Sequence, residues 1–179
     1  IGSDRLAAYR RELAAFREEF GGARELPDVD FFLFGMGPRR KLLYRSGALI
    51  ESVTGETLRQ WAVKSQCILP PDYSVLLTTE EGREIRLLED EHAVWIEEDG
   101  RRAPIAGTQK PVHLPAFEGY RYPQILRVLH QELLVNVIDG KPVPNYFVYA
   151  RPWYRDGAMM AMCFCATKNM SLIEGWVLD

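Results

Sequence analysis

The first regular pattern along the chain is a set of apolar residues three or four positions apart within residues 4–20. Its members are Leu6, Tyr9, Leu13, Phe16 and Phe20, with Arg and Glu on the opposite side. This spacing predicts an amphipathic helix, which Gly21 and Gly22 would end. We therefore assign residues 1–22 to an N-terminal amphipathic helix that packs on the rest of the molecule.

Between residues 30 and 107 the pattern changes to short apolar or alternating runs separated by turn residues. The predicted strands are 31–36, 41–45, 48–53, 57–64, 73–79, 83–89, 92–98 and 101–105. Asp99-Gly100 suits a tight hairpin because both residues tolerate positive φ. Strands that are apolar on both sides, such as 73–79, need cover on both faces. We therefore expect 30–107 to form an antiparallel β-sandwich-like domain of about eight strands.

The C-terminal third of the sequence has a helical pattern. Residues 108–121 contain two prolines and predict a linker. The segment 122–179 follows, and a wide apolar face predicts a helix over 122–138 that Asp139-Gly140 ends. A loop at 139–155 leads into 156–166, which is apolar nearly all round and therefore predicts a buried helix. A last helical stretch runs to Asp179.

The distribution of charge argues against a nucleic-acid partner. The formal net charge is −3, and basic residues occur in short groups such as Arg39-Arg40-Lys41, each close to acids. A nucleic-acid surface needs a clustered basic stripe. We interpret these groups, and acid-rich turns such as 89–91, as solvated surface.

The distribution of apolar residues argues against a membrane partner. No run reaches the roughly 20 apolar residues that span a bilayer, and charged residues throughout 4–19 rule against a secretory signal there. These features favour a cytoplasmic location. A secreted protein stays an alternative, because the sequence begins with Ile1 instead of Met and leaves room for a cleaved leader.

The cysteines and histidines predict neither a disulfide framework nor a metal site. Three cysteines, Cys67, Cys163 and Cys165, are an odd number, and we expect the last two to be small core residues. The three histidines share no ligand spacing with one another or with the cysteines. We therefore expect no metal and no cofactor.

The candidate chemistry lies in 145–162, NYFVYARPWYRDGAMMAM, where an aromatic loop meets a charged pair and an apolar helix. The candidate substrate-binding residues are Tyr146, Trp153, Tyr154, Arg155 and Asp156. Aromatic rings can stack on a sugar, and the charged pair can grip neighbouring hydroxyl groups through paired hydrogen bonds. In the structural alternative, Asp156 only caps the following helix and pairs with Arg155.

The stretch RPWYRDGAMMAM, residues 151–162, resembles the W-x-R-D segment of the six-hairpin glycosidase superfamily, which includes glucoamylases and amylo-α-1,6-glucosidase-type enzymes. The order of β-rich region, linker, helix and motif also resembles members with a β-sandwich before an (α/α)6 barrel. The resemblance implies that Trp153 stacks near the sugar, and that Arg155 and Asp156 bind its hydroxyl groups. Gly157 departs from the family, in which Ser, Ala or Thr is common at this position.

The resemblance implies an α+β fold with an N-terminal helix, an antiparallel β-sandwich-like domain and the first helices of an incomplete (α/α)6 barrel. The helices of six hairpins need roughly 140 residues, more than 122–179 contains. We therefore expect the remaining barrel helices on another chain or in a missing segment. The catalytic carboxylates of the family lie later in the barrel, so they are expected outside this chain, and its catalytic residues stay unknown.

The expected function is that of the N-terminal part of a carbohydrate-active enzyme, a glycoside hydrolase that acts on oligosaccharides. In this function the chain would contribute sugar-binding residues to the active site. Two alternatives stay open. One is a non-catalytic β-sandwich binding module that uses β-domain aromatics such as Trp61 and Trp95. The other is an assembly protein whose exposed helices pair with another copy.

Overall fold

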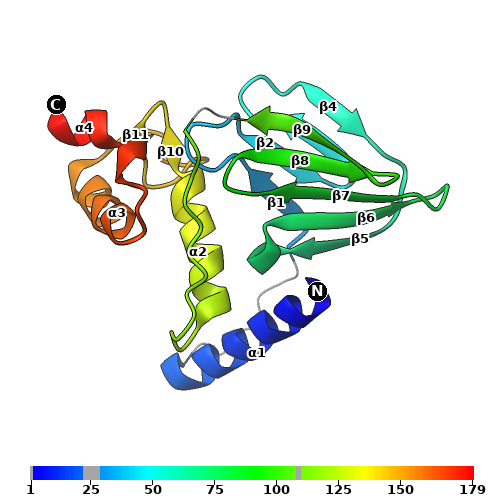
Figure 1. Cartoon of the computed structure of the whole chain (residues 1–179), viewed down its shortest axis with the longest axis horizontal. Helices are drawn as coiled ribbons and strands as arrows, with labels where there is room; N and C mark the ends of the chain where they lie inside the picture. Colours follow the sequence, from blue (N-terminus) through cyan, green and yellow to red (C-terminus); the bar gives the residue numbers. More distant parts are fainter. Residues whose placement is uncertain (1, 22–28, 108–109) are drawn as a thin grey trace.

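The computed structural model describes residues 2–21, 29–107 and 110–179. It combines helices with antiparallel sheets, so the fold is α+β, as predicted. In Figure 1, α2 (Pro123–Val135) stands beside the two larger sheets, and α1 (Gly2–Phe20) crosses its lower end. The C-terminal helices lie on the far side of α2 from the sheets.

The first sheet contains four antiparallel strands in chain order. They are β1 (Phe31–Phe34), β2 (Leu42–Arg45), β3 (Ala48–Glu51) and β4 (Thr57–Gln60). Ser46 and Gly47 form the turn between β2 and β3, with φ of 47° and 81°. A Cβ at position 47 would lie 2.6 Å from the carbonyl oxygen of Trp61, so this turn requires glycine.

The second sheet contains five antiparallel strands, also in chain order. They are β5 (Val63–Leu69), β6 (Ser74–Thr79), β7 (Glu84–Glu89), β8 (Ala93–Glu98) and β9 (Arg101–Gly107), and η1 (Pro70–Asp72) joins β5 to β6. Asp99 and Gly100 form the turn between β8 and β9 with φ of 51° and 71°. The prediction of a tight hairpin at Asp99-Gly100 is confirmed.

The predicted strand 57–64 is in fact two strands. The chain leaves the first sheet after Gln60 and enters the second at Val63, and β5 then extends to Leu69. We did not predict the residues after Lys64 as a strand. β5 is an edge strand with mostly exposed side chains, so the alternation that marks a half-buried strand is missing from its sequence.

Both sheets contribute to one cluster of buried apolar side chains. Its members are Phe32, Phe34, Leu42, Tyr44 and Leu49 from the first sheet, and Val75, Leu77, Ile85, Leu87, Val94 and Ala106 from the second. The hydroxyl group of Tyr44 also donates a hydrogen bond to Oε1 of Gln66, at 2.6 Å, across the two sheets. The alternating inward residues of the sequence therefore meet in one apolar layer.

The elements that follow α2 make up the rest of the helical part. They are β10 (Val137–Ile138), β11 (Lys141–Pro142), α3 (Tyr154–Ala166), η2 (Met170–Leu172) and α4 (Glu174–Leu178).

A second cluster of buried residues joins this helical part to the sheets. Leu134 of α2 and Phe164 of α3 are fully buried in this cluster, together with Met36 from the loop after β1.

The predicted helix 122–138 is shorter than its apolar pattern. α2 ends at Val135, and Asp139-Gly140 forms the turn of the hairpin β10–β11, with φ of 48° and 72°. We had interpreted this pair as a helix end. A hairpin turn and a helix end both favour residues that adopt positive φ, so Asp-Gly does not distinguish between them.

The prediction that 156–166 is a buried helix is wrong. α3 begins at Tyr154 and buries only the side that contains Gly157, Met160 and Phe164. Met159 and Met162 are 61% and 66% exposed on the other side. Cys163 and Cys165 are also exposed, so they are not the core residues that we expected.

Asn169 ties the end of α3 to the segment that precedes α2. Its side-chain oxygen accepts a hydrogen bond from the backbone N–H of His113 at 2.8 Å, and its Nδ2 donates to the His113 carbonyl at 2.9 Å. Nδ2 also lies 3.3 Å from Nε2 of His130, a buried residue of α2. Burial, with the positive charges of His113 and Arg127, lowers the pKa of His130 from 6.5 to about 4.

Carboxylates of α1 hold the N-terminal end of α2. Oε2 of Glu12 accepts hydrogen bonds from the backbone N–H groups of Gln124 and Ile125, at 2.9 and 3.0 Å. These two groups belong to the first turn of α2, where backbone donors have no partner within the helix. Oε2 of Glu19 also accepts a 2.5 Å hydrogen bond from the hydroxyl group of Tyr122. The N-terminal helix thus caps α2, as well as packing against it.

Candidate functional site

Four of the five predicted substrate-binding residues lie together at the start of α3. Trp153 is the N-cap residue, and Tyr154, Arg155 and Asp156 form the first turn. Trp153 and Tyr154 are 55% and 85% exposed. Nη2 of Arg155 lies 3.7 Å from Oδ2 of Asp156, which makes a long, solvent-facing ion pair. The start of α3 therefore presents two aromatic rings, an exposed guanidinium group and a partly exposed carboxylate to solvent.

Asp156 does not cap α3 in the way that we considered. The helix begins two residues earlier than predicted, so Asp156 is its third residue, and among the described residues no side chain caps this end. The carboxylate still lies in the first turn, where the helix dipole favours a negative charge.

Gly157 and Trp176 explain how α4 packs on this surface. A Cβ at position 157 would lie within 3.0 Å of three ring atoms of Trp176, closer than real side chains approach. Tyr154 stacks on the same indole, with ring centroids 5.7 Å apart and planes 27° apart. Glycine at 157, a departure from the resembled family, is therefore required by the position of Trp176.

Tyr146, the fifth predicted residue, belongs to a different surface. Its hydroxyl group lies 2.6 Å from the hydroxyl group of Ser52, which follows β3. Its backbone N–H donates to Oδ1 of Asn136 at 2.7 Å. These contacts place Tyr146 on the sheet side of the helical part, where it lines a cleft that the sequence did not predict.

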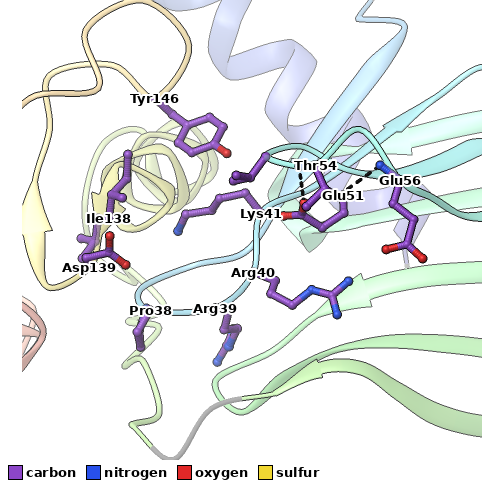
Figure 2. A pocket seen from close by; sticks show the side chains of 12 residues that line it. Pro38, Arg39, Arg40, Lys41, Glu51, Thr54, Glu56, Ile138, Asp139 and Tyr146 are labelled. Atoms are coloured by element: carbon purple, nitrogen blue, oxygen red, sulfur yellow. Dashed lines mark hydrogen bonds between the residues drawn. The ribbon is translucent and has the colours of Figure 1, made fainter.

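The cleft has a volume of about 490 Å³ and lies between the loop around Arg40 and the hairpin β10–β11 (Figure 2). Its lining residues are Pro38, Arg39, Arg40, Lys41, Glu51, Val53, Thr54, Glu56, Val137, Ile138, Asp139 and Tyr146. The basic and acidic residues in this lining are equal in number. A balanced, mixed lining favours a polar neutral ligand over a polyanion.

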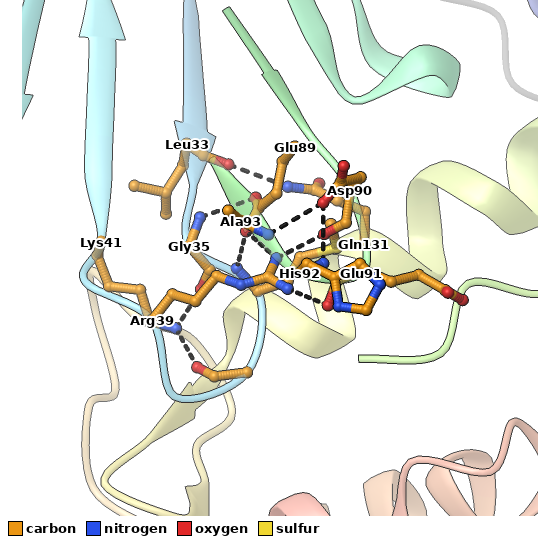
Figure 3. Close-up of polar contacts among 12 residues, drawn as sticks. Leu33, Gly35, Arg39, Lys41, Glu89, Asp90, Glu91, His92, Ala93 and Gln131 are labelled. Atoms are coloured by element: carbon orange, nitrogen blue, oxygen red, sulfur yellow. Dashed lines mark hydrogen bonds and ion pairs between the residues drawn. The ribbon is translucent and has the colours of Figure 1, made fainter. Parts of the chain in front are cut away.

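A buried ion pair anchors the loop that forms one wall of the cleft. Nη1 of Arg39 lies 2.7 Å from Oε1 of Glu89, and both side chains are fully buried. The two carboxylate oxygens also accept hydrogen bonds from the backbone N–H groups of Gly35 and Met36, at 2.9 and 2.7 Å (Figure 3). Arg39 donates further to the carbonyl oxygens of Asp90 and Glu91.

This network corrects two interpretations from the sequence. We had taken Arg39-Arg40-Lys41 and the acid-rich turn 89–91 as solvated surface, but Arg39, Lys41 and Glu89 are all buried. Glu89 is buried because Gly35, Met36 and Arg39, which lie 50 to 54 residues earlier in the chain, surround its carboxylate. A usable signal was the pair Gly35 and Gly37 just after an apolar strand, since it indicates a specialised loop.

The amine of Lys41 lies inside the same loop. Nζ donates hydrogen bonds to the carbonyl oxygens of Gly35 and Gly37, the latter at 2.8 Å. Burial is the main cause that lowers the pKa of Lys41 to about 8, and the negative charge of Glu89 acts in the opposite direction by raising it. In Figure 2 the side chain runs along the cleft with its amine turned toward Asp139.

Trp61 packs against the shared core of the sheets, and Arg102 covers the ring of Trp95 at 4.3 Å. Among the described residues, His, Cys, Asp and Glu form no group that could hold a metal ion. Over the same residues, no helix is both long and apolar enough to cross a bilayer.

Comparison with known proteins identifies no relative. No family model matches the chain, and neither a curated protein nor a solved structure matches it.

Proposed function

We propose that this chain is the N-terminal part of a carbohydrate-active enzyme, a glycoside hydrolase that acts on oligosaccharides. In this proposal the two facing sheets are its β-sandwich domain. α2 and α3 are the first helices of an (α/α)6 barrel, which other helices complete from another chain or a further segment. Trp153, Arg155 and Asp156 contribute a sugar subsite, and the catalytic carboxylates come from the other helices.

The exposed apolar side of α3 carries this proposal. Met159 and Met162 are 61% and 66% exposed, and Ala158, Cys163 and Cys165 share their exposure. A helix that is apolar all round is typical of a buried position. Contiguous apolar surface of this kind marks an interaction site. Further barrel helices would cover it and make α3 an inner wall.

The position of Trp153 supports the subsite. The residue ends the loop that leads into α3, and the charged pair Arg155–Asp156 follows in the first turn. When further helices exclude water from this end of α3, hydrogen bonds from the pair to sugar hydroxyl groups would strengthen. An aromatic face beside charged donors and acceptors is what recognition of a pyranose ring needs.

Binding measurements on the native protein test the subsite. We expect a panel of oligosaccharides that varies in sugar and linkage to contain at least one ligand in isothermal titration calorimetry. Trp153→Ala and Arg155→Ala should each weaken its binding by at least about tenfold. Arg101→Ala, at an exposed position on β9, is the matched control and should bind as the wild type does. Unchanged binding in both subsite variants would show that the subsite is misplaced.

The mass and assembly state of the native protein test the barrel. The proposal predicts that the native polypeptide or its complex contains additional helical hairpins. It also predicts that Met159 and Met162 are protected there from hydrogen peroxide. The same exposed side supports a second candidate, a helix-mediated assembly protein. Analytical ultracentrifugation that shows a homodimer of this chain alone, with both methionines protected, would favour that second function.

A further inference from the structure

The loop from Gly35 to Lys41 encloses the amine of Lys41. Gly35 and Gly37 have φ of 113° and 63°, values that favour glycine. A Cβ at position 35 would lie 3.0 Å from the carbonyl carbon of Arg40, so the loop closes tightly on itself. The result of this closure is that the carbonyl oxygens of Gly35 and Gly37 both accept from Nζ.

Two acceptors match the neutral form of an amine. A neutral amine has two N–H donors and one lone pair, whereas an ammonium group has three donors. When Lys41 is neutral, the two carbonyl oxygens hold both of its hydrogens, and the lone pair is left free to react. A neutral lysine amine with a free lone pair can act as a nucleophile.

Lys41 also lines the cleft, so a small molecule bound there would lie beside this residue. Lys41 itself is only 5% exposed, and Asp139 and Tyr146 lie on the wall that the helical part supplies. Its polar residues can donate to and accept from hydroxyl groups. A volume of about 490 Å³ lies within the range of small-molecule sites.

We propose that Lys41 is a reactive amine that forms an iminium with a small, hydroxylated aldehyde bound in this cleft. The site is separate from the surface of α3 and does not rest on the proposed function. Tyr146 and Asp139 face the ligand, and the carbonyl oxygens of Gly35 and Gly37 position the amine.

The step balances with a proton and a water molecule. The lone pair of Nζ attacks the aldehyde carbon, a C–N bond forms, and one amine hydrogen moves to the former carbonyl oxygen. Uptake of one proton and loss of water then leave the iminium, which keeps one N–H and a positive charge. One loop carbonyl can therefore accept the remaining N–H of the product, and the other can stabilise its positive charge through the carbonyl dipole.

The charges around Lys41 support reaction near neutral pH. Burial and the neighbouring Arg39 lower the pKa of Lys41, and Glu89 and Asp139 oppose them, with a result of about 8. Arg40 and Glu51 also line the cleft and offset each other in sign. At pH 7.5 a far larger fraction of Lys41 is neutral than of a lysine with an ordinary pKa of about 10.4.

Reductive labelling of the wild-type protein tests the proposal. The probe is glycolaldehyde with sodium cyanoborohydride, which reduces the iminium to a stable secondary amine, followed by peptide mass spectrometry. At pH 7.5 we expect Lys41 to be labelled at least about tenfold faster than the exposed Lys64 and Lys141. Labelling of Lys41 no faster than of these two lysines, or only in urea, overturns the proposal and leaves Lys41 a purely structural anchor.

A charge variant separates a reactive amine from a structural one. Asp139→Asn removes a negative charge that favours the ammonium form, and Asn tolerates the positive φ of this position. We expect Lys41 to be labelled faster at pH 6.5 in this variant than in the wild type. Asp99→Asn, in the turn between β8 and β9, is the matched control and should leave the rate unchanged. An Asp139→Asn rate equal to that of the control contradicts the proposed role of the cleft.

Discussion

The indole ring of Trp176 lies directly on Gly157, in the space that a side chain at this position would fill. The contact joins α4 to the start of α3, where Trp153 and Arg155 form the proposed subsite. Tyr154 completes the arrangement by stacking on the same ring. Packing around one glycine therefore sets how the C-terminal segment meets the candidate sugar-binding surface.

Gly157→Ala should destabilise the protein by about 1–3 kcal/mol, because the added methyl group overlaps the ring and forces Trp176 to move. We expect a lower denaturation midpoint and a shift of tryptophan fluorescence in the native state. Gly175→Ala is the matched control, since a methyl group there meets open space within the described part of the chain. The control should be neutral or slightly stabilising in α4. Equal stability of the two variants would show that Trp176 does not pack on position 157.

Glu12→Ala should lower the free energy of unfolding by about 1 kcal/mol, since it removes the acceptor for two backbone donors at the start of α2. Urea denaturation followed by circular dichroism measures this loss. Glu18→Ala changes the same residue type at an exposed position of α1 and should have little effect. If both variants lose the same stability, the effect belongs to α1 itself and not to the cap.

Breaking the buried pair of Arg39 and Glu89 should be far more costly than breaking an exposed pair. Arg39→Met and Glu89→Gln should each cost about 3–5 kcal/mol, because each leaves a buried partner unsatisfied. The double variant should lose less than the sum of the two, which a double-mutant cycle measures.

The surface pair of Arg83 and Glu98 supplies the reference for this cycle. It is well formed at 2.5 Å but partly solvent-exposed, so its coupling should be below about 1 kcal/mol. A coupling between Arg39 and Glu89 as small as the reference value would contradict their role as anchor of the 35–41 loop.

His130 should make the protein less stable in weak acid. The folded state holds the pKa of His130 at about 4, below its unfolded value of 6.5, so only the unfolded chain takes up this proton between the two values. Stability is complete above pH 6.5 and is lost as the pH falls toward 4, by about 3 kcal/mol from this residue.

Comparison of the free energy of unfolding of wild type and His130→Gln between pH 7 and pH 4.5 isolates the contribution of His130. Other acidic groups titrate in both proteins, so only the difference between their stability curves reports on His130. We expect the curve of the variant to be flatter in this range. Parallel curves would indicate that the folded protein accepts the proton on His130 readily.

Much of the fold was accessible to sequence reasoning because its signals are local. The apolar spacing in 4–20 marks α1, and turn pairs such as Asp99-Gly100 mark the hairpins. The errors occurred where a neighbour decides the outcome. Val63–Leu69 became an edge strand because β6 lies beside it, and Asp139-Gly140 became a hairpin turn because β11 returns alongside β10.

The candidate sites divide in the same way. Four candidate residues are contiguous in sequence: Trp153, Tyr154, Arg155 and Asp156. Their proximity could be predicted because they surround the first turn of one helix. Tyr146 is close to them in sequence, yet its hydroxyl group meets Ser52, 94 residues away. The cleft and its buried lysine join segments that no local pattern connects.

The sequence by itself determined the α+β class, most element positions and the run of aromatic and charged residues that leads into α3. These features depend on spacing and backbone preference within a few residues. Only the tertiary structure decided which charges are buried and which apolar side of α3 is left open. Burial of a charged group depends on partners from other segments. Glu89 compensates the charge of Arg39 inside the protein, and the carbonyl oxygens of Gly35 and Gly37 accept hydrogen bonds from the buried amine of Lys41.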